Sequence, residues 1–182
     1  MTPTPVQKVA ALPHVRYEIE ALLLTPRHDS TDEAIVETVY FRKMAHARAL
    51  LDFFVTPTVD RYRDDVLSED FQFPARAIYP DSQDQEFRDR FNKDILHISY
   101  SRTRRDARTK EWPLQQMLPP IIDRALEFVR HVEGLTWQLP DAERQMWGAI
   151  RSRYTGAAPL VQSTANVASA QVVSVELKRK NA

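Results

Sequence analysis

Glycine is the residue whose scarcity most constrains how this chain can fold: its 182 residues include only 3 glycines, against 12 prolines. Tight turns with positive φ angles rely mainly on glycine, so a fold with many β-hairpins is disfavoured. The prolines lie between segments of helical apolar periodicity, which is where helix ends are expected. The sequence therefore predicts an all-α fold.

Five segments carry this periodicity, and together they predict a bundle of about five helices. The expected helices cover residues 14–24, 30–55, 81–100, 113–132 and 140–156, and a long loop over 56–80 includes a helical turn within 64–71. Pro119-Pro120 either bends the fourth helix or marks its true start. We expect a bundle domain over residues 13–156, a flexible N-terminus over 1–12 and a mobile tail over 157–182.

The second expected helix is apolar around much of its circumference. Val36, Val39, Leu50 and Phe54 share one side of a helical wheel, and other apolar residues extend that surface. A helix with such a wide apolar surface is typical of the centre of a bundle. We therefore expect this helix to be the central one.

Composition excludes several classes of function. The chain has no cysteine, which rules out disulfides and thiolate metal sites. Lys plus Arg and Asp plus Glu are both 25, so no whole-protein attraction to nucleic acid or membrane is predicted. No secretory signal or membrane-spanning run is recognisable, and we expect a cytoplasmic protein without membrane contact.

No cofactor or metal site is predicted. The five histidines show no paired metal-ligand spacing, and three glycines leave no nucleotide-cradling loop. An acidic group in the long loop has the oxygen ligands of a hard-cation site, but a solvated loop is the favoured interpretation. Its members are Asp60, Asp64, Asp65, Glu69 and Asp70.

The third expected helix carries a polar stripe that is a candidate catalytic site. Arg90 and His97 are seven residues apart, so they lie on one side of the helix, and Asp94 and Ser101 continue that line. A histidine at the edge of an interface can act as an acid or base near neutral pH. An arginine beside it can hold a phosphate. The alternative interpretation is structural: an ordinary ion pair of Arg90 with Asp94, and a hydrogen bond from His97 to a neighbouring helix.

The Arg-x6-His spacing on a helix of a small bundle resembles the motif of the HEPN superfamily. Many members of that superfamily are metal-independent ribonucleases, in which the motif helices of two subunits meet. The resemblance implies a homodimer in which Arg90 and His97 are the catalytic positions. It covers about fifteen residues and the helical architecture.

A more diffuse resemblance links this chain to a group of uncharacterised bacterial helical proteins. It rests on residues 46–54 and 64–66, and on Asn92-Lys93 with His97. It brings no known activity, so it supports the fold alone.

Polar residues on the second helix are a further candidate. Arg48 and Asp52 are i,i+4 neighbours, and His46 lies within the apolar side. Arg48 and Asp52 would complete a polar site if they faced Arg90 and His97. The favoured interpretation is an ion pair along the helix and a buried, hydrogen-bonded His46.

A basic run follows His97. Residues 85–110 contain eight Lys or Arg against four Asp or Glu, and Tyr100 and Trp112 flank the connector. Basic loops beside aromatic residues can bind RNA through phosphate contacts and stacking. A solvated polar loop fits equally well. The candidate RNA-binding positions are Asn92, Lys93, Arg102, Arg104 and Arg105.

Two functional hypotheses follow. The first, which we favour, is a helical bundle that acts through protein–protein interaction, with the tail as a contact element. The second is a HEPN-like homodimeric ribonuclease or RNA-binding protein that uses Arg90 and His97.

Overall fold

The computed structural model describes residues 2–24, 31–93, 113–135 and 139–156. Within these residues it contains five α-helices, two short 3-10 helices and no strand, which confirms the predicted all-α bundle. The α-helices are α1 (Pro5–Leu23), α2 (Glu33–Val55), α3 (Asp81–Lys93), α5 (Leu114–Gly134) and α6 (Asp141–Gly156), and the 3-10 helices are η1 (Thr58–Asp60) and η2 (Ser68–Phe71).

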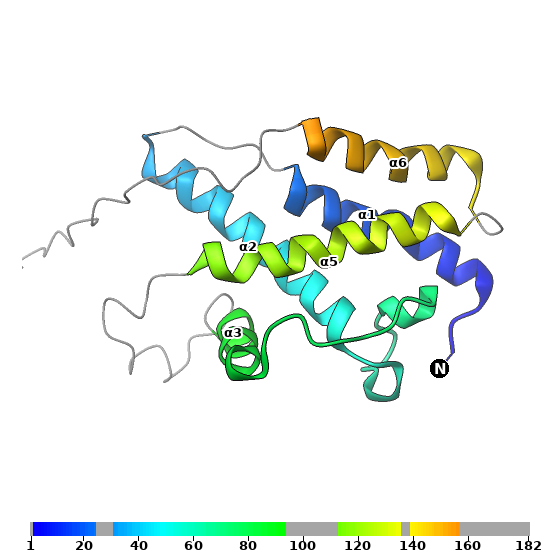
Figure 1. The fold of residues 1–182 in the computed structure, drawn as a ribbon, viewed down its shortest axis with the longest axis horizontal. Coiled ribbons are helices and arrows are strands. Elements are labelled where there is room, and N and C mark those ends of the chain that lie inside the picture. The colour runs from blue at the N-terminus through cyan, green and yellow to red at the C-terminus, as the bar shows by residue number, and fades with distance from the viewer. Residues whose placement is uncertain (1, 25–30, 94–112, 136–138, 157–182) are drawn as a thin grey trace, which may run out of the picture.

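The helices form a bundle in which α2 runs diagonally across α5 (Figure 1). α1 packs against α2, α5 and α6, whereas α5 packs against α2 and α6. The smaller α3 contacts α2. The first half of α2 extends past the end of α1 along the long axis of the molecule, as Figure 1 shows. α2 is therefore central along part of its length only.

α1 corrects the expectation of a flexible N-terminus over residues 1–12. The helix begins at Pro5, not near His14, and it continues through Pro13. Its start is a capping box, in which the Thr4 hydroxyl accepts from the Gln7 amide and the Gln7 side chain accepts from the Thr4 amide. Pro5 suits the first helical position, because the amide it lacks has no partner there.

α5 also runs through prolines. Pro119 and Pro120 lie inside the helix, which begins at Leu114, so they do not mark its start. Both prolines lie near the N-terminal end of a helix of 21 residues. The later turns pack against α2 and α6, and burial of their apolar side holds the helix together despite the missing amide donors.

The remaining boundaries agree with the sequence. Asp32 caps α2 through a hydrogen bond from the Ala34 amide, and α2 ends before Pro57. The expected helical turn in the long loop is present as η2. The third helix is described as far as Lys93, and its expected continuation over 94–100 lies outside the described residues, as does the expected tail over 157–182.

The part of the core in which the long loop packs against α5 consists of aromatic side chains. Phe128 of α5 packs edge-on against rings from α2, the loop and α6, with centroid distances between 5.1 and 5.8 Å. These rings belong to Phe53, Phe54, Phe71, Phe73 and Trp147.

Polar groups anchor the long loop to α5. His131 Nε2 is hydrogen-bonded to the Phe71 carbonyl at 2.7 Å, and Arg124 donates to the Pro74 carbonyl. The Tyr79 hydroxyl donates to the Met117 carbonyl at 2.7 Å. These bonds satisfy loop carbonyls and α5 groups that burial would otherwise leave unpaired.

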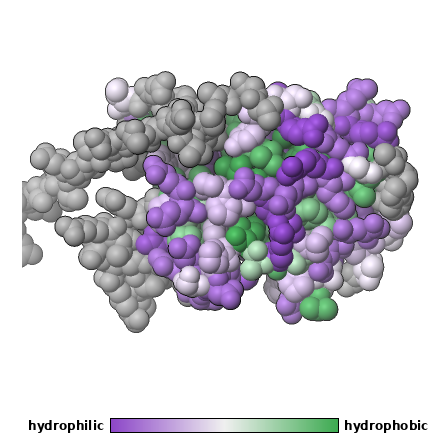
Figure 2. Space-filling model, viewed as in Figure 1, coloured by the Kyte–Doolittle hydropathy of each residue, from purple (hydrophilic) through white to green (hydrophobic). Residues whose placement is uncertain are grey.

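The outer surface of the bundle is mostly hydrophilic on the face drawn in Figure 2, with hydrophobic residues gathered near its middle. None of the helices in the described ranges has the length and apolar character that a membrane crossing requires.

Candidate functional site

Arg90 is the only residue of the predicted catalytic stripe that lies within the described residues. Arg90 lies on α3 and is 7% exposed, and its Nε lies 3.3 Å from Glu86 Oε1. The carboxylate near Arg90 is therefore one turn before it. Asp94, the predicted partner, lies outside the described residues, and so does His97.

Most of the predicted RNA-binding positions also fall outside the described residues. Arg102, Arg104 and Arg105 belong to residues 94–112, and Lys93 is described only as the last residue of α3. Asn92 is the one member of this set whose side chain is described. The Arg90–His97 geometry therefore stays a prediction.

Asn92 links α3 to α2. The Arg48 Nε donates to Asn92 Oδ1 at 3.0 Å, so Arg48 faces α3 one residue beyond the buried Phe91. Asp52 lies one turn further along α2, and desolvation raises its pKa although the residue is exposed at the surface. The positive charges of Arg48 and Arg88 offset only part of that increase in pKa. A polar junction of α2 and α3 thus lies on the side of α3 that carries Asn92, about 160° around the helix from Arg90.

His46 has the structural role that the sequence favours. Its Nδ1 lies 2.7 Å from Glu18 Oε2 of α1, and its ring meets Tyr17 edge-on at 5.5 Å. The side chain is 13% exposed. This contact fastens α1 to α2 and leaves His46 away from the junction at Asn92.

Two acidic residues of the long loop, Glu69 and Asp70, bind groups of the loop itself. Asp70 pairs with Arg61 and accepts from the Leu67 amide at 3.0 Å. Glu69 accepts from the amide and hydroxyl of Thr58, which lowers the pKa of Glu69. Across the described residues, no three His, Cys, Asp or Glu side chains gather in an arrangement that could hold a metal ion.

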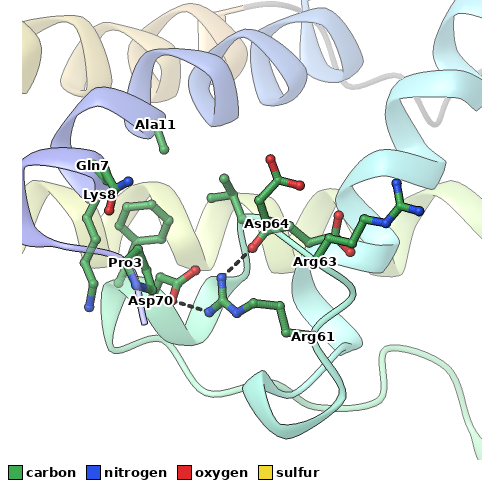
Figure 3. Close-up of a pocket in the computed structure, with 11 residues that line it drawn as sticks. Pro3, Gln7, Lys8, Ala11, Arg61, Arg63, Asp64 and Asp70 are labelled. Atoms are coloured by element: carbon green, nitrogen blue, oxygen red, sulfur yellow. Dashed lines mark hydrogen bonds and ion pairs between the residues drawn. The ribbon is translucent and has the colours of Figure 1, made fainter. Parts of the chain in front are cut away.

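A shallow pocket of about 220 Å³ lies between this loop and the start of α1 (Figure 3). Its charged lining residues are balanced, three basic and three acidic, and the Arg61–Asp70 pair uses two of them. This balance favours neither an anion nor a cation as ligand. The charged lining residues are Lys8, Arg61, Arg63, Asp64, Asp65 and Asp70.

The first half of α2 is the surface that sequence reasoning missed. Ile35 is 40% exposed and Tyr40 is 46% exposed, and Val36 and Val39 between them are only half-buried. The expectation that the whole apolar side of α2 is central is therefore wrong for these turns. Met44 is the first residue of α2 that is buried among those whose side chains are described.

The reason lies in the length of the neighbouring helices. α1 ends at Leu23, and α2 extends beyond it (Figure 1), so within the described residues α1 covers the later turns of α2 and not the first ones. We name the side formed by Ile35, Val36, Val39 and Tyr40 the α2 apolar face. At 100° per residue these four positions share a sector of about 140°, and Phe41 lies on the opposite side.

Comparisons with protein-family models, with curated proteins and with solved structures find no match to this chain.

Proposed function

We propose that this protein acts by binding another protein chain through the α2 apolar face. One observation carries the proposal: a single side of α2 is buried over its later turns, whereas over its first turns it is half-buried at its centre and exposed at its edges. Ala47, Leu50 and Phe54 are at most 1% exposed, whereas Ile35 and Tyr40 on the same side are at least 40% exposed.

Exposed apolar side chains that gather on one helix face are typical of interaction surfaces. A helix face with apolar residues at i, i+1, i+4 and i+5 is suited to pack against another helix. Tyrosine is also enriched in the buried centres of interfaces. Together, the spacing and composition of the α2 apolar face favour a helix of a partner chain as the group that covers it.

A photocrosslinking amino acid placed at Tyr40 tests the proposal in cells. We expect a discrete covalent adduct from position 40 and none from the same amino acid at Tyr62, which is 63% exposed in the long loop. Mass spectrometry would identify the adduct. The identified protein, once purified, should bind the unmodified chain and lose binding to Val39→Glu, because the charge lies in the centre of the contact.

Equal labelling from positions 40 and 62 would contradict the proposal, and so would undiminished binding of Val39→Glu. Thermal unfolding of Val39→Glu must match that of the unmodified chain, so that loss of binding is not loss of fold.

A second candidate function is RNA cleavage or binding by Arg90 and His97. It rests on the Arg-x6-His spacing, which puts Arg90 and His97 on one side of the expected third helix. In this proposal His97 acts as acid or base, and Arg90 stabilises charge on the phosphate.

An RNA-degradation assay tests this candidate. Purified protein should cleave RNA without added metal, and His97→Ala should remove the activity. Arg130→Ala, on the exposed side of α5, should retain it. Equal cleavage by the unmodified chain and His97→Ala would exclude the catalytic role, as would no cleavage by either.

A further inference from the structure

We infer that the pocket between α1 and the long loop binds a small zwitterion, in which a short aliphatic body separates a carboxylate from an ammonium group. This site is independent of the α2 apolar face, because the loop follows the last turn of α2 and the pocket lies at the start of α1. The inference is carried by the distribution of charge over the two walls of the pocket.

An ion pair in the lining of the pocket is complete without a ligand. Arg61 Nη2 lies 2.5 Å from Asp70 Oδ1, and the two side chains are 11% and 5% exposed. Arg61 also donates to the Asp65 carbonyl, and Asp70 accepts from the Leu67 amide (Figure 3). Because these groups already have partners, this part of the pocket is neutral, and a ligand does not have to order it.

The charged groups that remain differ between the two walls. Lys8 is the charged lining residue on α1, whereas the loop contributes Arg63, Asp64 and Asp65. The α1 wall therefore has one positive charge, and the loop wall has one negative charge in excess. Figure 3 shows Lys8 and Asp64 on opposite sides of the pocket.

These charges are available to a ligand. Within the ranges that the structure describes, neither the Lys8 ammonium nor the carboxylates of Asp64 and Asp65 have an ion-pair or hydrogen-bond partner. A ligand that complements both walls presents a carboxylate to α1 and an ammonium group to the loop.

The start of α1 favours the same orientation of the ligand. Lys8 lies near the beginning of the helix, and the first turn of α1 contains no acidic residue. The aligned peptide dipoles of a helix also leave partial positive charge at its N-terminus. Both effects stabilise a carboxylate at the α1 wall and oppose an ammonium group there.

The space between the walls suits a short aliphatic chain. Ala11, Val66 and Phe71 line it, and Val66 is 40% exposed although it is apolar. An aliphatic body lying against Val66 buries this surface and so adds to affinity. The volume of about 220 Å³ is below the roughly 300–1,000 Å³ of pockets for drug-sized ligands, so the body is limited to a few carbons.

Titration with 6-aminohexanoate, followed by NMR of the backbone amides, tests the inference. Two relatives of this probe each lack one charge: hexanoate has no ammonium group, and hexylamine has no carboxylate. We expect 6-aminohexanoate to bind at least about threefold more tightly than either, which is the size of effect that partly exposed ion pairs produce. Equal affinity for the three compounds, or no binding at tens of millimolar, would overturn the inference.

Substitutions assign each charge of the probe to its wall. Lys8→Gln should lower the affinity for 6-aminohexanoate to that for hexylamine, without weakening the binding of hexylamine. Asp64→Asn combined with Asp65→Asn should instead lower it to the affinity for hexanoate. Asp60→Asn makes the same change in the same loop at a residue outside the pocket lining, so it should leave all three affinities unchanged.

The reverse assignment, or an equal loss of affinity in Asp60→Asn, would contradict the inferred orientation and overturn the inference. Thermal unfolding of each variant must match that of the unmodified chain, so that weaker binding is not loss of fold.

The amide signals also locate the bound probe. Changes should be confined to the surroundings of Lys8 and Val66, and the first turns of α2 should show none. Changes spread over the whole surface would mean non-specific association and would overturn the inference.

Free ω-amino acids and short peptides have the same pair of separated charges, and the titration distinguishes them. Alanylalanine has an ammonium group and a carboxylate at its two ends. Tighter binding of 6-aminohexanoate would support the inference with an ω-amino acid as the source of the ligand. Tighter binding of alanylalanine, with the same response to Lys8→Gln, would support it with a short peptide as the source.

Discussion

Arg124 is a charged residue that the bundle holds inside its core. Its side chain is 5% exposed, its guanidinium lies 3.8 Å above the Phe73 ring, and it donates to Glu127 at 2.7 Å as well as to the Pro74 carbonyl. Arg124→Ala leaves that carbonyl without its donor, and we expect the free energy of unfolding to fall by about 2 kcal/mol or more.

Urea denaturation measures this change. Arg130→Ala, on the exposed side of the same helix, should stay within about 0.5 kcal/mol of the unmodified chain. Similar losses for the two variants would mean that Arg124 does not anchor the loop.

Asp52 makes the stability of the folded bundle depend on pH in a predictable direction. Desolvation raises its pKa even with Arg48 and Arg88 nearby, so the folded state binds the Asp52 proton more tightly than the unfolded state does. Its ionised form therefore opposes folding at neutral pH, and that penalty shrinks as the pH falls through the folded pKa and is gone below the unfolded pKa.

Asp52→Asn should accordingly be at least as stable as the unmodified chain at neutral pH. The difference in stability between Asp52→Asn and the unmodified chain should disappear as the pH falls towards about 4, near the ordinary pKa of an aspartate. Thermal unfolding across that range measures it. A variant that is less stable at neutral pH would show that the attraction of Asp52 to the arginines outweighs its desolvation.

At the scale of single elements, α1 depends on its first residues. Thr4→Ala removes the hydroxyl of the capping box, and we expect a loss of about 1 kcal/mol in the free energy of unfolding. Thr2→Ala lies outside the helix and is the matched control. Hydrogen exchange should show faster exchange in the first turn of α1 in Thr4→Ala alone. An unchanged rate would argue against the cap.

α2 differs in burial along its length, and paired truncations should show how much each part contributes to stability. Leu50→Ala removes a side chain that is 1% exposed, and it should cost about 3 kcal/mol. Ile35→Ala, 40% exposed, should cost less than about 1 kcal/mol when measured on dilute protein. Equal costs in urea denaturation would mean that the α2 apolar face is covered within the monomer.

The sequence predicts the bounds of the helices better than it predicts which side of each helix is buried. The bounds of α2 follow from Asp32 and Pro57, which are local signals. The start of α1 is also encoded locally, in Thr4 and Gln7, but the two Thr-Pro steps and the weak apolar periodicity of residues 1–12 favour a flexible segment instead.

The exposure of the α2 apolar face depends on where the neighbouring helices end, and the sequence of α2 alone does not contain that information. Periodicity places Val36 and Leu50 on one side of α2, but only the end of α1 determines that one is half-exposed and the other buried. Likewise, the sequence allows Arg48 to be either an ion-pair partner or a group facing α3. The hydrogen bond to Asn92 requires the position of both helices.

At the scale of the whole molecule, Phe128 joins the parts of the bundle into one core. Its ring touches aromatic rings of α2, the long loop and α6, so removing it weakens several packing contacts at once. We expect Phe128→Ala to lower the free energy of unfolding by about 4 kcal/mol. Phe41→Ala is the same substitution on a ring that is 59% exposed, and it should change the stability little.

The same connectivity predicts one cooperative transition. Trp147 is fully buried against Phe128, so its fluorescence reports on this core, while circular dichroism reports on all helices. Trp112→Phe and Trp137→Phe leave Trp147 as the only tryptophan of the chain. If the core couples α2, the loop and α6, the two signals should change at the same denaturant concentration. An earlier loss of helical signal would show that part of the bundle unfolds without disturbing Phe128 and its neighbours.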